Sequence, residues 1–331
     1  MHELALQLII YALEHKASDI HFFKTNHSFS IQLRTIDGMQ ALHQDRWPSS
    51  ILSYLKFIAD FDLTSPKAPQ SGSFSVRIDQ DTIPCRLSVI HNQNMETAVL
   101  RLLSCRTDMK IEQLTSDKDA VRFFNSLCCS RQGLYLACGP TNSGKTTTIH
   151  AVLHEIACTT KHKIVSLEDP IEIADPLYVQ LQISEQEGFG YEKGIEELMR
   201  HDPDIIYIGE IRNAYCARKL VSAALSGRMV VSTIHAGTVR EALIRLLDFG
   251  IEPYELAGIV SGLFACRLYK KPDGTKECVY EIAGKQEILH ILQTKAYSGS
   301  HQTLDQKIKR ALALGFIEDR QAEYDLADLK G

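Results

Sequence analysis

Residues 139–146 read Gly139-Pro140-Thr141-Asn142-Ser143-Gly144-Lys145-Thr146. This stretch matches in full the G-x-x-x-x-G-K-[ST] pattern of a phosphate-binding loop. Glycines let such a backbone curl so that successive N–H groups point at phosphate oxygens, and the following helix adds its positive N-terminal end. The pattern therefore predicts that 139–146 binds the phosphates of a nucleotide.

The residues on either side of the loop support this interpretation. An apolar run at 134–137 precedes it, and a helical pattern at 147–156 follows it, which is the strand, loop and helix order that the pattern requires. A glycine-rich turn that only caps a helix is the alternative, and this context disfavours it. Lys145 would reach the β and γ phosphates, the Thr146 hydroxyl would ligate Mg²⁺, and Thr147 would complete the binding segment.

Further apolar runs predict the sheet around the loop. From about residue 120 onward, runs at 134–137, 163–167, 205–209 and 229–233 alternate with helical patterns. Strands buried on both faces need such continuous runs, and alternation with helices indicates a mainly parallel sheet with helices on both sides. We therefore expect an α/β domain over 120–331, with a helical C-terminal part.

Acidic side chains follow two of these predicted strands, at the edge where α/β sheets place their ligands. Glu168 comes at the end of the second run and would hold Mg²⁺ or its waters, while Glu172 is a weaker candidate; a solvated acidic loop is the alternative. Glu210 follows the third run and would orient or deprotonate the attacking water. Arg212 would pair with Glu210 or with a neighbouring subunit.

A histidine ends the fourth run. His235 follows the apolar segment 229–234 and would sense the γ-phosphate or couple sites between subunits. A histidine at a strand end more often fills a packing role, and only its neighbours here favour function.

Composition limits the remaining possibilities. The 331 residues are 44% hydrophobic, enough for two domains with separate cores, and the net charge of -5 gives no global basic field for nucleic acid. The nine cysteines form no repeated framework, which favours a reducing cytoplasm. No apolar run approaches the roughly 20 residues that cross a bilayer, so we expect any membrane association to come through a partner.

The first 104 residues predict a separate α+β domain, followed by a polar linker at 105–119. Helical patterns cover 1–16 and 49–61, and a turn is expected at Asp37-Gly38. The predicted strands are 20–23, 29–33, 73–78, 83–90 and 97–103.

Taken in order, these segments resemble the motifs of the secretion ATPases of type II secretion, type IV pili and competence pseudopili. That family carries a Walker A loop, an Asp box, a Walker B segment and a His box, which 139–146, 168–172, 202–212 and 232–235 match. Residues 17–21 (ASDIH) and 34–38 (RTIDG) are similar to its N-terminal signatures. The resemblance implies a RecA-like ATPase domain with a mainly parallel sheet, preceded by a PAS-like domain.

The resemblance also implies a mechanism and partners. ATP and Mg²⁺ would be the cofactors, and arginines of the N-terminal domain would reach the nucleotide. Arg86 and Arg101 are the candidates by position, although ordinary ion pairs on surface strands explain them equally well. The family further implies a homo-oligomeric ring, expected to be a hexamer, at the cytoplasmic face of the membrane. Its partner would be an inner-membrane platform protein of the ComGB or PilC type, and no sequence-specific nucleic acid binding is expected.

Two departures from the family pattern carry information. Asn142 stands where glycine is usual, but asparagine tolerates left-handed backbone geometry, so the loop should still form. After the His box only Cys266 and Cys278 appear, without a C-x-x-C pair, so we expect no zinc.

This short layout without a zinc module resembles the competence members of the family, so we expect a motor that assembles a competence pseudopilus for DNA uptake. A pilus retraction ATPase is an alternative, but no retraction motif is found between residues 264 and 331. A RecA-like nucleic acid translocase is a second alternative that the acidic charge balance disfavours. A third alternative is a protein that binds nucleotide without hydrolysing it. The presence of Glu210 argues against this alternative.

Overall fold

The structure is a computed structural model that describes residues 1–35, 38–42, 46–62, 69–78, 81–92, 94–103, 109–184, 188–318 and 320–328. The chain divides into two compact units, Met1–Arg106 and Thr107–Gly331. Asp37 of the expected turn and residues 105–108 of the expected linker lie outside the described residues. Within the described part, no helix is both long enough and apolar enough to cross a membrane.

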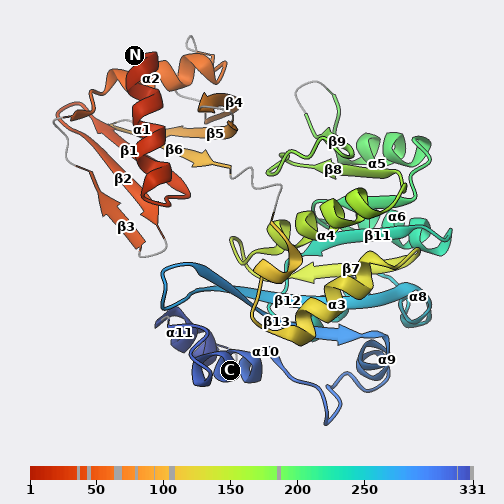
Figure 1. The fold of residues 1–331 in the computed structure, drawn as a ribbon. Coiled ribbons are helices and arrows are strands. Elements are labelled where there is room, and N and C mark those ends of the chain that lie inside the picture. Colours follow the sequence, from red (N-terminus) through yellow and green to blue (C-terminus); the bar gives the residue numbers. More distant parts are fainter. Residues whose placement is uncertain are drawn as a thin grey trace. The chain divides into compact units, whose positions relative to one another are not determined.

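The first unit is a six-stranded antiparallel sheet in the order β3-β2-β1-β6-β5-β4, with two helices (Figure 1). The predicted helices and strands of this unit are confirmed, and β3 is an addition. The elements are α1 (His2–Glu14), β1 (Asp19–Thr25), β2 (Phe29–Thr35), β3 (Gly38–Ala41), α2 (Ser50–Ile58), β4 (Gln70–Ile78), β5 (Asp81–His91) and β6 (Met95–Leu102).

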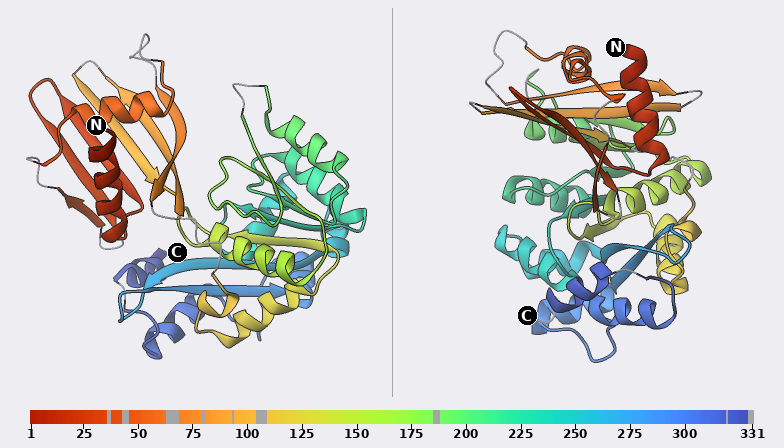
Figure 2. Two further views of the ribbon diagram at one scale, coloured as in Figure 1. Left: turned by 45° about the horizontal axis from the view of Figure 1, so that its top comes forward. Right: turned by 90° about the vertical axis from the view of Figure 1, so that its left-hand side faces the viewer.

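Alternation along the strands gives this sheet one apolar face. Ile20 and Phe22 of β1 are fully buried, together with Leu8 of α1 and Leu52 of α2. Both helices therefore pack on the same face of the sheet, as Figure 2 shows. The opposite face carries the alternate residues of each strand, which are largely polar.

The second unit is a seven-stranded sheet in the order β13-β12-β7-β11-β10-β8-β9. Every pairing is parallel except that of β12 with β13, so the expectation of an α/β fold with a mainly parallel sheet is confirmed. The strands are β7 (Gly133–Cys138), β8 (Ile164–Glu168), β9 (Val179–Gln182), β10 (Ile205–Ile208), β11 (Met229–Ile234), β12 (Val260–Lys270) and β13 (Lys276–Gly284).

Helices cover both faces of this sheet, and each face has its own core. Leu134 and Leu136 of β7 belong to one cluster, whereas Tyr135 and Ala137 of the same strand belong to the other. The first cluster includes residues of α5 (Tyr191–Arg200), α6 (Ala214–Leu225), α7 (Val239–Asp248), α8 (Pro253–Ile259), α9 (Lys285–Thr294), α10 (Leu304–Ala313) and α11 (Arg320–Asp328). The second includes residues of η2 (Ile111–Gln113), α3 (Lys118–Cys128) and α4 (Lys145–Thr159).

Two parts of this unit differ from what the sequence predicts. The hairpin β12–β13 extends the sheet in a region expected to be helical, and helices α9, α10 and α11 follow it. In the stretch expected to be a linker, η2 packs against α3 and α4, and α3 begins at Lys118.

Candidate functional site

The phosphate-loop pattern lies between β7 and α4, as predicted, and its backbone requires its glycines. Gly139 has a φ of 146° and Gly144 a φ of 98°, both in the region that disfavours L side chains. A Cβ atom on Gly139 would lie 2.6 Å from Oγ of Ser143 and 2.7 Å from the carbonyl oxygen of Cys266. Asn142 has a φ of 63°, so the left-handed geometry expected of it is present. The loop is therefore a tight backbone turn that leads directly into a helix N-terminus.

The residues of the loop differ in how accessible they are. Pro140, Thr141 and Asn142 are exposed, whereas Ser143 is buried, with its Oγ 3.4 Å from Sγ of Cys266. Lys145, Thr146 and Thr147 form the first turn of α4 and are half-buried. The backbone N–H groups of such a first turn have no partner within the helix, so they are free to bind an anion.

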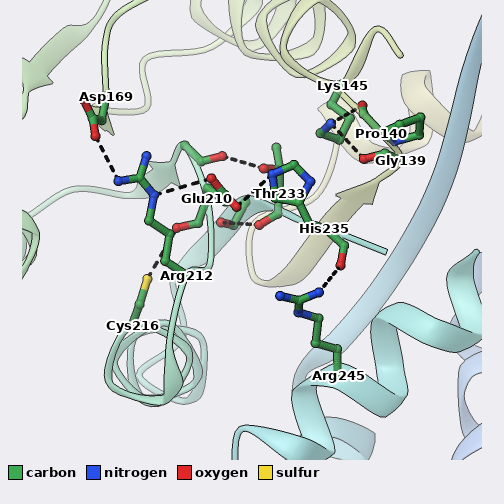
Figure 3. Close-up of polar contacts among 12 residues, drawn as sticks. Gly139, Pro140, Lys145, Asp169, Glu210, Arg212, Cys216, Thr233, His235 and Arg245 are labelled. Carbon is green, nitrogen blue, oxygen red and sulfur yellow. Dashed lines mark hydrogen bonds and ion pairs between the residues drawn. The ribbon is translucent and has the colours of Figure 1, made fainter. Parts of the chain in front are cut away.

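Lys145 folds back over the loop. Its Nζ donates to the carbonyl oxygens of Gly139 at 2.9 Å and Pro140 at 2.6 Å (Figure 3). Burial lowers the pKa of Lys145; Cys266 and Cys138 act most strongly in the opposite direction, and Glu210 and Glu172 act in that direction to a smaller extent. Two carboxylates thus act electrostatically on the lysine that would bind phosphate.

Glu210 lies between an imidazole and a guanidinium (Figure 3). Its Oε1 is 3.0 Å from Nε2 of His235, and its Oε2 is 3.4 Å from Nε of Arg212. Arg212 also donates from Nη1 to Oδ2 of Asp169 at 2.9 Å and stacks on the ring of Tyr191 at 5.0 Å. The structure therefore brings Glu210 and His235 together, and Arg212 links Glu210 to the acidic segment, residues 168–172.

Backbone contacts fix the strand ends that carry this group. The hydroxyl of Tyr191 donates to the carbonyl oxygen of Glu210 at 3.1 Å. Oγ1 of Thr233 donates to the carbonyl oxygen of Gly209 at 2.6 Å. Arg245 donates from Nη1 to the carbonyl oxygen of His235 at 2.8 Å. No sequence motif pointed to Tyr191 or Arg245, because their roles depend on tertiary contacts.

Glu168 is enclosed by protein groups. It is 2% exposed, and its Oε1 accepts from Oγ of Ser166 at 2.6 Å and from Nε2 of Gln180 at 3.0 Å. Its Oε2 is 3.2 Å from Nε2 of His150 on α4. Both carboxylate oxygens are thus engaged, and the role of Glu168 at a metal stays a prediction. Glu172, the weaker candidate, is the acidic-segment carboxylate whose charge acts on Lys145.

The candidate arginines lie in one row across the first unit's sheet. Asp19 is paired in register with Arg34 on one side and Arg101 on the other, and Arg101 is paired with Arg86. Nε of Arg101 donates to Oδ1 of Asp19 at 2.9 Å, and Asp19 is 1% exposed. Among the described residues, no hydrogen bond or ion pair engages the Arg86 side chain. The ion pair expected as the alternative exists for Arg101, and the contact of either arginine with nucleotide stays a prediction.

The donor set fits Mg²⁺ that is bound together with nucleotide. In the described ranges, no group of three or more His, Cys, Asp or Glu side chains is arranged to hold a metal ion by itself. Mg²⁺ at nucleotide sites keeps several waters and needs only one or two protein ligands in addition to phosphate oxygens. The half-buried Thr146, at the start of α4, provides a hydroxyl of this kind.

Comparison with known proteins adds an independent line of evidence. The family described as type II/IV secretion system protein matches residues 1–314. The competence protein ComGA of Halalkalibacterium halodurans is 33% identical over 98% of this chain and 98% of its own length. ComGA of Bacillus subtilis is 29% identical over 91% of each chain. The solved structure of the pilus retraction motor PilT with bound ADP covers 97% of this chain and 96% of its own, with a TM-score of 0.77 at 24% identity, and shares the fold.

Proposed function

Because this chain belongs to the type II/IV secretion system protein family, we propose that it hydrolyses ATP as a motor that powers assembly of a competence pseudopilus for DNA uptake. Two competence proteins resemble the chain over nearly its whole length, and this supports the competence role. The likeness to the retraction motor is one of fold.

The observation that carries the proposal is the position of Glu210. Its carboxylate contacts His235 and Arg212, and it follows β10, a strand of the same sheet as β7, which precedes the phosphate loop. A carboxylate in this setting orients a water and accepts its proton. His235 contacts one oxygen of Glu210, so the imidazole fixes the direction of the carboxylate.

Residues 139–147 would hold the phosphates, with Lys145 and the first-turn N–H groups of α4 as donors. Thr146 would ligate Mg²⁺, and bound Mg²⁺ would neutralise negative charge during phosphoryl transfer. In the acidic segment, Glu168 and Glu172 are the candidate carboxylates for contact with the waters of the metal. Glu172 is the better placed of the two, because both oxygens of Glu168 are engaged by protein groups.

Arg86 and Arg101 would complete the site from the first unit, which we propose to be PAS-like. A guanidinium beside the transferred phosphoryl group neutralises charge that builds up there. We further propose that the chain assembles as a hexamer beneath an inner-membrane platform protein, at the cytoplasmic face of the membrane. Nucleotide turnover would then be converted into force on the platform protein.

Phosphate release by the purified full chain tests hydrolysis. We expect activity in the wild type, its loss in Lys145→Ala and Glu210→Gln, and no change in Glu192→Gln, a control at an exposed glutamate of α5. Equal rates in all four proteins would contradict the proposal.

A second measurement separates the pilus motor from a nucleic acid translocase. Phosphate release is compared with and without the cytoplasmic domain of the platform protein, and with and without single-stranded DNA. Stimulation by the platform domain supports the motor, whereas stimulation by DNA alone contradicts it.

A further inference from the structure

A thiol, an imidazole and a carboxylate lie in line on the surface of the second unit, outside the group around Glu210. Cys158 is an exposed residue in the last turn of α4. Its Sγ is 3.5 Å from Nε2 of His154, and Nδ1 of the same ring is 2.6 Å from Oδ2 of Asp175. The Asp175 side chain is 1% exposed and that of His154 is 27% exposed. The thiol is therefore accessible, while the carboxylate behind it is enclosed.

Local structure explains why these side chains meet. His154 and Cys158 are four residues apart on one helix and so share a face of α4. Asp175 comes from the segment between β8 and β9, where its Oδ1 accepts from the N–H of Leu177 at 3.0 Å. Its own N–H donates to Oε1 of Gln180 at 2.7 Å. The carboxylate is thus fixed in place, and it orients the imidazole toward the sulfur.

We propose that Cys158 is a modification site that undergoes thiol–disulfide exchange with small disulfides, with His154 as its general base. In the step, Sγ attacks one sulfur of the disulfide while Nε2 of His154 accepts the thiol proton. A protein–S–S–R bond forms, the original S–S bond breaks, and the second sulfur leaves as a thiolate. That thiolate takes the proton from His154 and departs as a thiol. A base oriented by a third group is the arrangement that activates such nucleophiles.

Two described cysteines, Cys128 and Cys129, differ from Cys158 in their setting. Cys129 is also exposed, but within the described residues no hydrogen bond or ion pair engages its sulfur. Cys128 beside it is partly buried, and burial raises the pKa of its thiol to about 12. Cys129 is therefore an internal reference for Cys158 in the same molecule.

A hydrogen-bonded chain links this site to the acidic segment. Gln180, which accepts from the N–H of Asp175, donates from Nε2 to Oε1 of Glu168 at 3.0 Å. A group attached to Cys158 crowds His154 and weakens its contact with Asp175. Modification would therefore loosen the segment that follows β8.

Site-resolved mass spectrometry tests the chemistry on the full chain, with bis(2-hydroxyethyl) disulfide as the probe. General-base assistance contributes roughly 10²–10⁴-fold in favourable cases, so we expect Cys158 to react at least about tenfold faster than Cys129. His154→Gln should bring Cys158 down to the rate of Cys129, and Asp175→Asn should lower it. Equal rates in the wild type, or an unchanged rate in His154→Gln, would overturn the proposal. A rise in the Cys129 rate would identify a variant that has unfolded.

Hydrogen exchange tests the structural link without any activity measurement. After modification, peptides that cover residues 174–182 should exchange faster, because the N–H groups of Asp175 and Leu177 lose protection. Cys158→Ser treated in the same way should show no change. Unchanged exchange in the modified wild type would overturn the link to the acidic segment.

Discussion

Glu210 and His235 follow neighbouring parallel strands and meet at one edge of the sheet, with Oε1 of the glutamate 3.0 Å from Nε2 of the histidine. Their side chains are 26% and 48% exposed. The fold therefore holds the pair in place, while water can still reach both side chains. A residue that accepts a proton from a bound water requires this access.

Removal of the imidazole should slow turnover more than it weakens substrate binding. We expect His235→Ala to lower kcat on the order of 10²-fold, because Glu210 loses the contact that orients it, with little change in KM. Steady-state phosphate release measures both constants. His162→Ala, a histidine outside this group, is the control and should behave as the wild type.

A double variant shows whether the two residues act as a unit. Residues in one interacting group have non-additive effects, so Glu210→Gln combined with His235→Ala should be no slower than Glu210→Gln alone. Multiplicative losses would show that His235 acts independently of Glu210.

Gly139→Ala should disrupt the phosphate loop. The added methyl group meets Oγ of Ser143 and the carbonyl oxygen of Cys266 at a backbone angle that alanine disfavours. We expect a loss of about 2 kcal/mol or more in the free energy of unfolding, and loss of nucleotide binding. Urea unfolding and titration with a fluorescent nucleotide provide the two measurements. In Gly190→Ala a Cβ meets nothing within 4 Å, so that variant should leave both values near those of the wild type.

Position 142 tests the left-handed geometry of the loop. Asn142→Gly should change the free energy of unfolding by less than about 1 kcal/mol, because glycine adopts this conformation without steric cost. Asn142→Val should lose about 1–2 kcal/mol, since a β-branched residue disfavours a positive φ. If the valine variant were as stable as the glycine variant in urea unfolding, residue 142 would not be left-handed in solution.

Asp117 gives a prediction on pH. Its carboxylate caps α3, accepts from the N–H of Asp119 and lies 2.7 Å from Nζ of Lys307. Burial acts to raise the pKa of Asp117, but the hydrogen bond from Lys307 and that from Asp119 outweigh it, and the pKa lies below its usual value. The carboxylate therefore stabilises the fold above the unfolded-state pKa of about 3.9, and this contribution is lost as the pH falls through the lower folded-state pKa.

Asp117→Asn isolates this charge, because asparagine is an equally good helix cap. The difference in the free energy of unfolding between wild type and variant should be largest between about pH 5 and 7 and should shrink below about pH 4. Urea unfolding at a series of pH values measures it. A difference that stays constant over this range would rule out the charge as its source.

The sequence predicted those parts of the site that depend on local pattern. The phosphate loop has a fixed spacing, and Glu210 and His235 each follow an apolar run that becomes a central parallel strand. Because the carboxyl ends of parallel strands meet at one edge, their side chains could be expected to lie close together.

The features of the fold and the site that the sequence did not predict depend on tertiary contacts. Glu168 has the right position at a strand end, but contacts with His150 and Gln180 enclose it, and neither residue belongs to a recognisable pattern around it. The hairpin β12–β13 was missed because a short buried apolar run does not distinguish a strand from a helix. The row formed by Arg34, Asp19 and Arg101 depends on strand register, which sequence spacing alone does not give.

The same row across the sheet includes the candidate arginines Arg86 and Arg101. Asp19 pairs directly with Arg101, while Arg86 lies next to Arg101 in register and contributes a further positive charge. If these guanidinium groups neutralise charge on the transferred phosphoryl group, Arg86→Ala and Arg101→Ala should each lower kcat at least about tenfold and leave nucleotide affinity nearly unchanged. Arg77→Ala, at an exposed arginine of β4, is the control. Wild-type turnover in both variants would leave the row with a structural role only, in which Arg101 neutralises the buried Asp19.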